Sequence, residues 1–553
     1  MIKWQKYFPY NKPRKAQEKV IEKVLSDFKE NKKKYAIIDC GTGVGKSAIG
    51  MTIANYISNS SDFEGNFEEG AYFLTTQKLL QDQYENDFSC QGLMSLYSSS
   101  NYKCKKDKNA SCKDIQTALR TNSLTKNYDN CKYDCIYKKK KKDFIENKLG
   151  ITNFSYFLTE KNYSQKMPNK KVLVIDEAHN LESELTRFIE INISEYFSEK
   201  ILKLKVPKSL NTQFKVFNWI KNEYYLSLKK KKVFFENQLE KFGISSNKLE
   251  EFKKITKNYE MLVSHEKKIL QFISIYDKDN WVFDIDTNNS YKKFIFKPID
   301  ISQYAHEYIL NYADYVIFMS ATIISHEGFS LTLGLPYEKT SFVKEETPFP
   351  YENRPVIFSP AGSMSFKNIN NTLPVLTEMI HHILDLHESE KGIIHTHSIK
   401  IAEFIKNNIK QKYKKRILIA YGENRNKVLE KHIKSKKNTV LLSPSMSEGV
   451  DLKGDLSAFQ VICKIPFPYL GDKVVKKKME KWKWWYNVET MRTVIQSLGR
   501  SIRSEDDKAV TYILDDDWKR LMYKSKDILP KGFEKYYYEQ WNYRRRNYML
   551  LWQ

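Results

Sequence analysis

Apolar positions along this chain switch between two periodicities, one typical of helices and one typical of short buried strands. Residues 14–32 carry apolar side chains three and four positions apart, which predicts an amphipathic helix. Residues 35–40 (YAIIDC) form a short β-type run that ends at a glycine cluster, and residues 47–58 return to helical spacing. The same order, strand then helix, recurs over 70–88 and 170–185. This alternation predicts a parallel sheet with crossover helices.

The alternation returns after residue 310, which predicts a second α/β unit. Its strand candidates lie within residues 314–323, 391–409, 416–422, 438–445, 458–468 and 509–516. Two stretches interrupt the pattern. Residues 90–150 are basic, contain cysteines and lack periodic strands, whereas residues 190–305 are rich in Lys, Glu, Phe and Tyr at helical spacing. We interpret both stretches as insertions into the first α/β unit.

Length and composition narrow the class of protein. A chain of 553 residues is long enough for roughly three to four domains. The aromatic content of 14% argues against a disordered chain. No apolar run approaches the roughly 20 residues of a membrane span, and the N-terminus (MIKWQKYFPYNKPRK) has no apolar signal core. Seven cysteines are too few for a disulfide scaffold. We therefore expect neither secretion nor membrane insertion, and a cytoplasmic location, or a nuclear one in a eukaryote.

The charge balance points to a polyanionic partner. Lys and Arg number 92 against 67 acidic residues, which gives a formal net charge of +25. Nucleic acid is the first expectation and an anionic membrane surface the alternative. Lysine runs at 138–142, 229–232 and 476–478 are candidate contacts, although each run alone could be a solvated helix face. Trp482, Trp484 and Trp485 follow the third run and could stack on bases.

Residues 40–47 (CGTGVGKS) follow a predicted strand and open a predicted helix, the context that a phosphate-binding loop requires. Lys46 would reach the β and γ oxygens of a nucleotide, and Ser47 would ligate Mg²⁺. The strict pattern has glycine where this chain has Cys40. The remaining residues expected to bind the nucleotide are Gly41, Thr42, Gly43 and Gly45. A glycine-rich turn without a ligand is the competing interpretation.

A second strand, within residues 172–180 (VLVIDEAHN), ends in two carboxylates at the predicted sheet edge. Asp176 would hold Mg²⁺ through water, and Glu177 would polarise the attacking water. His179 could couple the nucleotide state to the rest of the molecule. Taken alone, the segment could be an acidic cluster at a helix N-terminus.

Residues 496–503 (QSLGRSIR) place Arg500 and Arg503 three positions apart, on one helix face, with Gln496 one turn before Arg500. An arginine from a second domain that reached the γ-phosphate would stabilise the charge developed during hydrolysis. A solvated basic helix end is the alternative.

These three sites together resemble those of a superfamily 2 helicase, and DEAHN resembles the XPD/DinG group of iron–sulfur DNA helicases. Further segments resemble the group's motifs in the expected order. They are Arg14 and Gln17 (the adenine-side Q motif), residues 75–83 (Ia), Ser320, Ala321 and Thr322 (III), 393–398 (IV), Glu448, Gly449 and Asp451 (V), 464–472, and 496–503 (VI). The resemblance covers nearly the whole chain. It implies that Arg14, Gln17, Glu448 and Asp451 also bind the nucleotide.

The resemblance implies an α/β fold with two RecA-like parallel-sheet motor domains, and with an Fe–S insertion and a helical Arch insertion in the first. We expect motor domain 1 over residues 1–89, 150–188 and 306–330, the Fe–S insertion over 90–149, the Arch over 189–305 and motor domain 2 over 331–553.

Four cysteines gather in the first insertion with the spacing C-x7-C-x18-C-x3-C, at Cys104, Cys112, Cys131 and Cys135. Four thiolates suit a tetrahedral zinc site or an iron–sulfur cluster, and unliganded cysteines are the third possibility. The spacing lacks the paired CxxC of a zinc ribbon. The resemblance implies a 4Fe–4S cluster, for which Cys90 could replace one ligand.

The expected function is that of an ATP- and Mg²⁺-dependent DNA helicase, with a role such as DNA repair. The resemblance implies translocation on single-stranded DNA in the 5′→3′ direction, action on forked or tailed duplexes, and a monomer. Three alternatives remain open at this point. They are an ATP-driven translocase that strips proteins from a single strand, a nucleotide-dependent nucleic-acid-binding subunit without unwinding, and an RNA motor.

Overall fold

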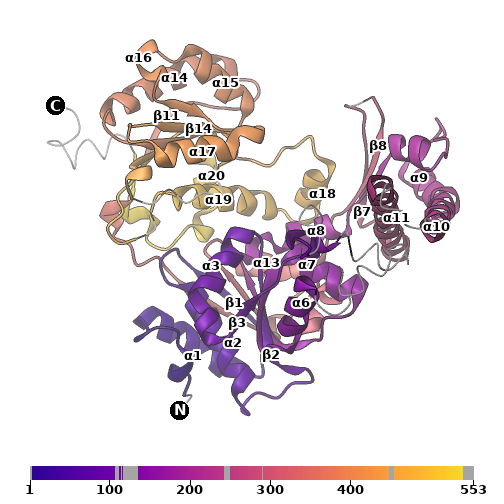
Figure 1. The fold of residues 1–553 in the computed structure, drawn as a ribbon. Helices are drawn as coiled ribbons and strands as arrows, with labels where there is room; N and C mark the ends of the chain where they lie inside the picture. The colour runs from indigo at the N-terminus through magenta and orange to yellow at the C-terminus, as the bar shows by residue number, and fades with distance from the viewer. Residues whose placement is uncertain are drawn as a thin grey trace.

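The computed structural model shows two α/β lobes and an elongated insertion at one side (Figure 1). It describes residues 3–105, 111–113, 115, 135–241, 249–288, 290–446, 452, 454–502 and 504–539. Within these residues, no helix has the length and apolar character needed to cross a bilayer.

The first lobe is built on a seven-stranded parallel sheet with the strand order β10-β1-β9-β5-β2-β4-β3. Its strands are β1 (Tyr35–Cys40), β2 (Glu68–Thr75), β3 (Leu93–Ser95), β4 (Leu149–Asn153), β5 (Lys170–Asp176), β9 (Tyr315–Ser320) and β10 (Thr340–Glu345). Its helices are α1 (Lys15–Lys29), α2 (Lys46–Asn59), α3 (Lys78–Phe88), α6 (Ile136–Glu146), α7 (Phe154–Thr159), α8 (Leu181–Ile189), α12 (Ser302–Tyr308) and α13 (His326–Leu333).

Both faces of this sheet are buried, because alternate side chains of each strand enter different cores. In β1, Ile37 joins the core that contains α7, α8 and α12, whereas Ala36 and Ile38 join the core formed with α1, α2 and α3. Burial on both faces explains why the strands are continuous apolar runs rather than alternating ones.

Strand pairing extends the first sheet beyond the ranges expected for motor domain 1. β3 was expected in the first insertion, yet it pairs with β4. β10 was expected in the second motor domain, yet all six of its residues pair with β1. The expected boundary at residue 330 is therefore too early, because this strand closes the edge of the first sheet beside the phosphate-binding loop.

The second lobe has its own seven-stranded parallel sheet, in the order β13-β14-β12-β15-β16-β11-β17. Its strands are β11 (Val356–Gly362), β12 (Gly392–His395), β13 (Ile417–Ile419), β14 (Val440–Ser443), β15 (Phe459–Ile462), β16 (Val510–Asp515) and β17 (Tyr537–Glu539). Its helices are α14 (Ile369–Leu386), α15 (Ile399–Asn408), α16 (Gln411–Lys414), α17 (Arg425–Lys434), α18 (Lys473–Lys481), α19 (Trp485–Leu498) and α20 (Asp517–Lys524). Two parallel sheets confirm the predicted fold class.

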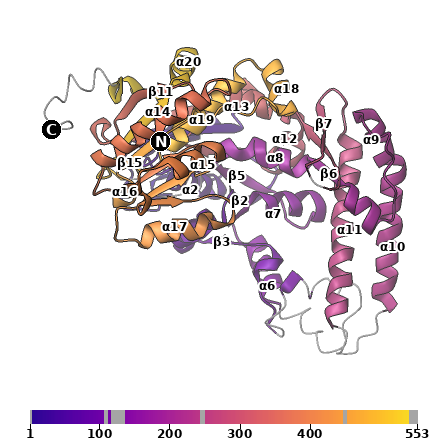
Figure 2. The ribbon, with the colours of Figure 1, turned by 90° about the horizontal axis from the view of Figure 1, so that it is seen from above.

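The insertion between α8 and α12 combines helices with a small sheet, so it is not purely helical as expected. It contains α9 (Gln213–Trp219), the long pair α10 (Tyr225–Lys241) and α11 (Leu249–Ile275), and an antiparallel sheet of β6 (Ile191–Ser194), β8 (Lys293–Pro298) and β7 (Trp281–Asp286). Figure 2 shows α10 and α11 side by side, with their lower ends near the level of α6. An ion pair of 3.5 Å between Lys113 and Glu260 joins the cysteine-containing insertion to α11.

Helix α18 belongs to the second lobe but forms ion pairs with the other parts of the chain. Lys473 pairs with Asp284 of β7 at 2.8 Å, Lys478 pairs with Glu182 of α8, and Lys481 pairs with Asp300. These contacts make Lys473, Lys478 and Lys481 links between this helix and other parts of the chain.

Two of the tryptophans that follow α18 pack against other parts of the protein, which leaves less of their rings available to stack on bases. The Trp485 side chain is buried, and the indole ring of Trp484 lies against α13. An ideal Cβ on Gly328 of α13 would come within 2.6 Å of that ring, so glycine is needed for this close approach. The expectation that Trp485 stacks on bases is therefore wrong, whereas Trp482 and Trp484 are partly exposed and their stacking stays a prediction.

The ion pair of Lys478 should matter more for stability than its exposed neighbour. The Lys478 and Glu182 side chains are 8% and 17% exposed, whereas Lys477 and Glu480 are 56% and 64% exposed. Lys478→Ala leaves a largely buried carboxylate without its partner, a loss of roughly 2–4 kcal/mol. We expect the melting temperature to fall by several degrees in Lys478→Ala and by no more than about 1 °C in the control Lys477→Ala. Equal melting temperatures would show that the pair does not hold the lobes together.

Candidate active site

The predicted phosphate-binding loop connects β1 to α2 at the carboxyl edge of the first sheet. Gly43 and Gly45 both have a φ of 88°, a left-handed conformation that glycine adopts without the steric cost of a side chain. A side chain on Gly43 would also collide with Phe349, whose Cζ lies 2.2 Å from an ideal Cβ. Gly41 and Thr42 line the cavity between the lobes. The loop thus has the shape and position that phosphate binding requires.

Three side chains brace this loop. Lys46 is the first residue of α2, and its Nζ donates to the Cys40 carbonyl oxygen at 3.0 Å. The Arg14 guanidinium donates to the carbonyl of Gly43, and Gln17 Oε1 accepts from the Arg14 backbone N–H at 2.9 Å. Arg14 therefore contacts the loop backbone from the start of α1, and Gln17 holds the Arg14 backbone with its amide beside Gly45.

The acidic pair lies where β5 ends, as the sequence predicts. Asp176 Oδ2 accepts from the Tyr84 hydroxyl at 2.8 Å, and the same hydroxyl interacts with Ser47. Burial raises the pKa of Asp176 to about 6, the Glu177 carboxylate adds to the increase, and Lys46 opposes it. A buried carboxylate beside Ser47 is suited to a divalent cation, which would favour its charged form.

Glu177 has a strained backbone. Its φ of 50° and ψ of 44° place it in the left-handed region, which non-glycine residues adopt at a cost. This conformation turns the chain sharply after the strand, and the Glu177 side chain remains 41% exposed in the cavity. The strain thus coincides with the residue expected to polarise water.

A hydrogen-bonded chain crosses from the first lobe to the second at His179. His179 Nδ1 lies 2.8 Å from Ser320 Oγ, and Gln496 Nε2 lies 2.7 Å from His179 Nε2. Because Nε2 accepts from the amide of Gln496, the proton resides on Nδ1, which donates to Ser320. Burial lowers the pKa of His179 to about 4, so the ring is neutral near pH 7. The imidazole thus connects the motif III segment to α19 of the other lobe.

A cavity of about 510 Å³ brings the two lobes' candidate residues together. It is lined by Gly41, Thr42, Glu177 and His179 from the first lobe and by Gln496 and Arg500 from the second. The two lobes approach each other closely here, because Thr42 Oγ1 of the first lobe lies 3.8 Å from an ideal Cβ on Gly499 of the second lobe. Glu448, Asp451 and Arg503 lie outside the residues that the structure describes, and their roles stay predictions.

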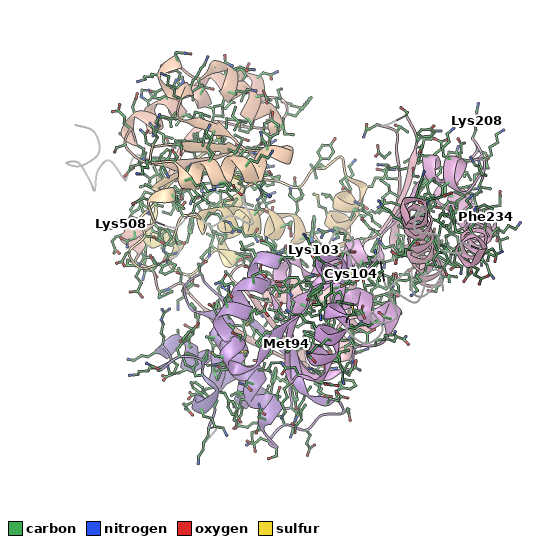
Figure 3. All side chains as sticks on the ribbon, in the orientation of Figure 1. Met94, Lys103, Cys104, Lys208, Phe234 and Lys508 are labelled. Carbon is green, nitrogen blue, oxygen red and sulfur yellow. The ribbon has the colours of Figure 1, made fainter. Side chains whose placement is uncertain are left out.

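Three of the four predicted cysteine ligands are buried in the first insertion. Cys104, Cys112 and Cys135 are each less than 9% exposed, whereas Cys90 is exposed. Figure 3 shows Cys104 beside the first lobe, on the side toward the long insertion. Cys131 lies outside the described residues.

The thiols interact electrostatically. Burial raises the pKa of Cys112 to about 11, and the neighbouring Cys135 and Cys104 thiols add to the increase. Thiolates in such surroundings need a cation, so the donors fit a metal group in their chemistry. Among the described residues, however, no three His, Cys, Asp or Glu side chains are arranged to hold a metal ion.

Sequence reasoning missed Tyr84, which binds the carboxylate of Asp176. The two residues are 92 positions apart, and Tyr84 is an ordinary aromatic position in an amphipathic helix. It also missed Phe349, Arg354 and Tyr536, which line the cavity from segments without a motif. No local pattern marks these residues, because only the packing of the two lobes brings them to the site.

Comparisons with known proteins agree with this geometry. Residues 11–205 match the family described as type III restriction enzyme, res subunit, and residues 380–535 match the family described as helicase C-terminal domain. A probable ATP-dependent helicase of Methanocaldococcus jannaschii is 24% identical, with 95% of each chain covered. The ATP-dependent DNA helicase DinG of Photobacterium profundum is 26% identical over 39% of this chain and 34% of its own.

Two solved structures share the fold. One described as an XPD helicase superposes with a TM-score of 0.61 at 16% identity, covering 96% of this chain and 100% of its own. Xpd4 of S. tokodaii gives a TM-score of 0.57 at 14% identity, covering 95% and 100%.

Two parallel-sheet lobes around a phosphate-binding loop, a helicase C-terminal domain match in the second lobe and a helicase relative over 95% of the chain define an ATP-dependent helicase. The chain is similar in sequence to helicases that include DinG, and its fold is similar to that of XPD helicases, in agreement with the resemblance recognised in its motifs.

Acid should destabilise the protein, because four histidines are buried as neutral rings. Burial lowers the pKa of His179, His265 and His397 to about 4 and that of His395 to about 3. Below the ordinary value of about 6.5, the unfolded chain therefore binds protons that the folded chain does not. The stabilisation is complete above pH 6.5 and is lost as the pH falls toward 4. Burial raises the pKa of Asp176 and Asp515 to about 6, so these two groups favour the folded chain as the pH falls. They are fewer than the four histidines, whose effect is therefore expected to dominate.

Melting temperatures between pH 7.5 and pH 5.0 test this expectation. His395→Leu should reduce the acid sensitivity, because the His395 ring is buried and burial lowers its pKa to about 3. The exposed His382 provides the control, and His382→Leu should leave the dependence of the melting temperature on pH unchanged. A melting temperature independent of pH in the native protein would contradict the burial argument.

Proposed function

We propose that this helicase acts on DNA, translocating along a single strand in the 5′→3′ direction and opening forked or tailed duplexes. The observation that carries the proposal is the His179 chain across the cleft. It places residues of both lobes on one nucleotide cavity, so nucleotide binding and release would close and open the cleft. The polarity follows the resemblance alone, whereas the DNA substrate also follows the name of the DinG relative, an ATP-dependent DNA helicase.

The proposed chemistry uses residues that line this cavity, namely Glu177, Gln496 and Arg500, together with residues of the adjacent phosphate-binding loop and the end of β5. Lys46 would bind the β and γ oxygens, and Ser47 with Asp176 would hold Mg²⁺, which supplies charge neutralisation when bound. Glu177 would orient the attacking water. Gln496 would sense the state of the site through His179, and Arg500 would approach the γ-phosphate from the second lobe. Arg14 and Gln17 hold the loop that receives the phosphates.

The proposed division of the chain follows the predicted domains with two changes, because motor domain 1 would also include β3. Motor domain 1 would run on to Glu345, because β10 belongs to its sheet. The cysteine insertion and the Arch would then lie between strands of that sheet, and their mutual contact through Lys113 and Glu260 would place them on the same side of the motor.

The basic helix α6 is the proposed contact with the DNA strand in the cysteine insertion. Lys138 and Lys139 are exposed, whereas Lys141 pairs with Glu160 and Lys142 lies 3.7 Å from Glu146. The first two lysines are thus the best placed of the run to neutralise phosphates.

Substitutions at Lys46 and Arg500 should separate binding from hydrolysis. Lys46→Ala should abolish DNA-stimulated ATP hydrolysis, because the phosphates lose their main side-chain cation. Arg500→Ala should retain ATP binding and slow turnover by roughly 10³-fold, since its contact belongs to the transition state. Steady-state hydrolysis and equilibrium binding of ATP measure the two effects. An Arg500→Ala protein that loses binding but keeps turnover would refute the assigned role.

Strand displacement tests the polarity. Duplexes with a 5′ single-stranded tail should be unwound in the presence of ATP, and the same duplexes with only a 3′ tail should not. Lys46→Ala serves as the inactive control. Unwinding of the 3′-tailed duplex alone would reverse the proposed direction, and ATP hydrolysis with no displacement of either duplex would favour a translocase.

We also propose that Cys104, Cys112, Cys131 and Cys135 hold a 4Fe–4S cluster. Protein purified without oxygen should contain about four iron and four sulfide per chain. Cys112→Ser should lose most of the iron and the visible absorption while retaining ATP binding, because the nucleotide cavity is built from other segments. Cys90→Ser, at an exposed cysteine, should keep the iron. Zinc in place of iron, or iron loss in Cys90→Ser instead, would overturn the assignment.

A further inference from the structure

The hydroxyl of Tyr84 reaches both side chains that are proposed above to hold Mg²⁺. It donates to Asp176 Oδ2 at 2.8 Å, and the Ser47 side chain hydrogen-bonds to the same hydroxyl. Asp176 ends β5 and Ser47 lies in the first turn of α2, so the hydroxyl joins two elements of the first lobe. Hydrogen bonds from a second residue to a metal ligand fix the orientation in which that ligand meets the metal.

The Asp176 carboxylate is held at both of its oxygens. Oδ1 accepts from the Glu177 backbone N–H at 2.9 Å, and Oδ2 accepts from Tyr84. Each carboxylate oxygen has room for a second partner, so both bonds are compatible with a bound cation or its water. The terminal torsion of an aspartate side chain is broad, so loss of either bond would leave the plane of the carboxylate less well defined.

The Tyr84 ring is itself fixed by packing. Its side chain is 1% exposed, and its ring centre lies 6.0 Å from that of Phe73 in β2 and 5.5 Å from that of Phe88. One turn earlier in α3, the buried Gln81 amide donates to Ser95 Oγ of β3 at 2.7 Å and ties the helix to the sheet. A hydroxyl on a rigid, buried ring is suited to hold another side chain in one geometry.

We propose that Tyr84 is a positioning residue for the metal end of the nucleotide site, where its hydroxyl holds Asp176 and Ser47 in the orientation that receives Mg²⁺. The inference rests on the nucleotide site proposed above and adds a residue to it. Tyr84 takes no part in a bond that forms or breaks, because its effect reaches the reaction through the two ligand side chains. A tyrosine that served packing alone would affect stability and leave the metal dependence of nucleotide binding unchanged.

The test compares nucleotide binding with and without the metal. Calorimetry on the full chain would measure the affinity for a non-hydrolysable ATP analogue in excess Mg²⁺ and in EDTA. Tyr84→Phe removes the hydroxyl and keeps the packed ring. We expect the affinity in Mg²⁺ to fall about tenfold, the lower end of the effect of such second residues, and the affinity in EDTA to stay within about twofold. Retained binding in EDTA also shows that the variant is folded.

Tyr56→Phe is the matched control. The Tyr56 hydroxyl donates to the Asp62 carboxylate at 3.3 Å, which is a tyrosine–aspartate hydrogen bond of the same lobe. Tyr56 lies in the last turns of α2, and neither it nor Asp62 is among the residues that line the nucleotide cavity. Both affinities should therefore match those of the native protein.

Two results would overturn the positioning role. Equal loss of both affinities in Tyr84→Phe would assign Tyr84 to the packing of the lobe, and an unchanged or raised affinity in Mg²⁺ would show that the hydroxyl does not orient the ligands. A native protein that binds the analogue equally in Mg²⁺ and in EDTA would instead refute the metal site proposed above.

Discussion

The hydrogen bond between Gln496 and His179 is the contact on which the arrangement of the two lobes depends most directly. It joins α19 of the second lobe to the turn after β5 of the first, and it requires a neutral imidazole. Burial keeps the ring neutral, and the second ring nitrogen is committed to Ser320. A charged ring could not accept from Gln496, so the low dielectric of the closed cleft and the hydrogen bond depend on each other.

A second set of contacts links the lobes through α18 and the tryptophan that precedes α19. The lysines of α18 pair with Asp284, Glu182 and Asp300, and Trp484 packs on α13. A movement of the second lobe would therefore pull on the Arch sheet as well as on the first motor domain. The Arch in turn rests on the first lobe through α11, where Tyr163 and Lys267 interact. The insertions are thus mechanically part of the motor.

The large positive charge of the chain serves more than one purpose. Some lysines are structural, such as Lys170, whose ammonium donates to backbone carbonyls beside the Tyr72 ring, and Lys161, which donates to the Met167 carbonyl. Burial lowers the pKa of both lysines to about 8. Net charge alone consequently overstates the surface available to a polyanion, and exposed lysines such as Lys138 and Lys139 are the relevant ones.

The sequence by itself determined the features that depend on neighbours in the chain. Strand-to-helix periodicity predicted both parallel sheets, and the loop at Gly41–Ser47 and the carboxylates at Asp176 and Glu177 were located because each motif is contiguous. Only the tertiary structure decided the features that join distant segments. β10 pairs with β1, so the first sheet extends past residue 330. Trp485, a candidate contact for bases, is buried. Tyr84 and Arg354 lie at the site although no sequence motif marks them. Local periodicity reports which face of an element is apolar, but the partner of that face is set by long-range packing.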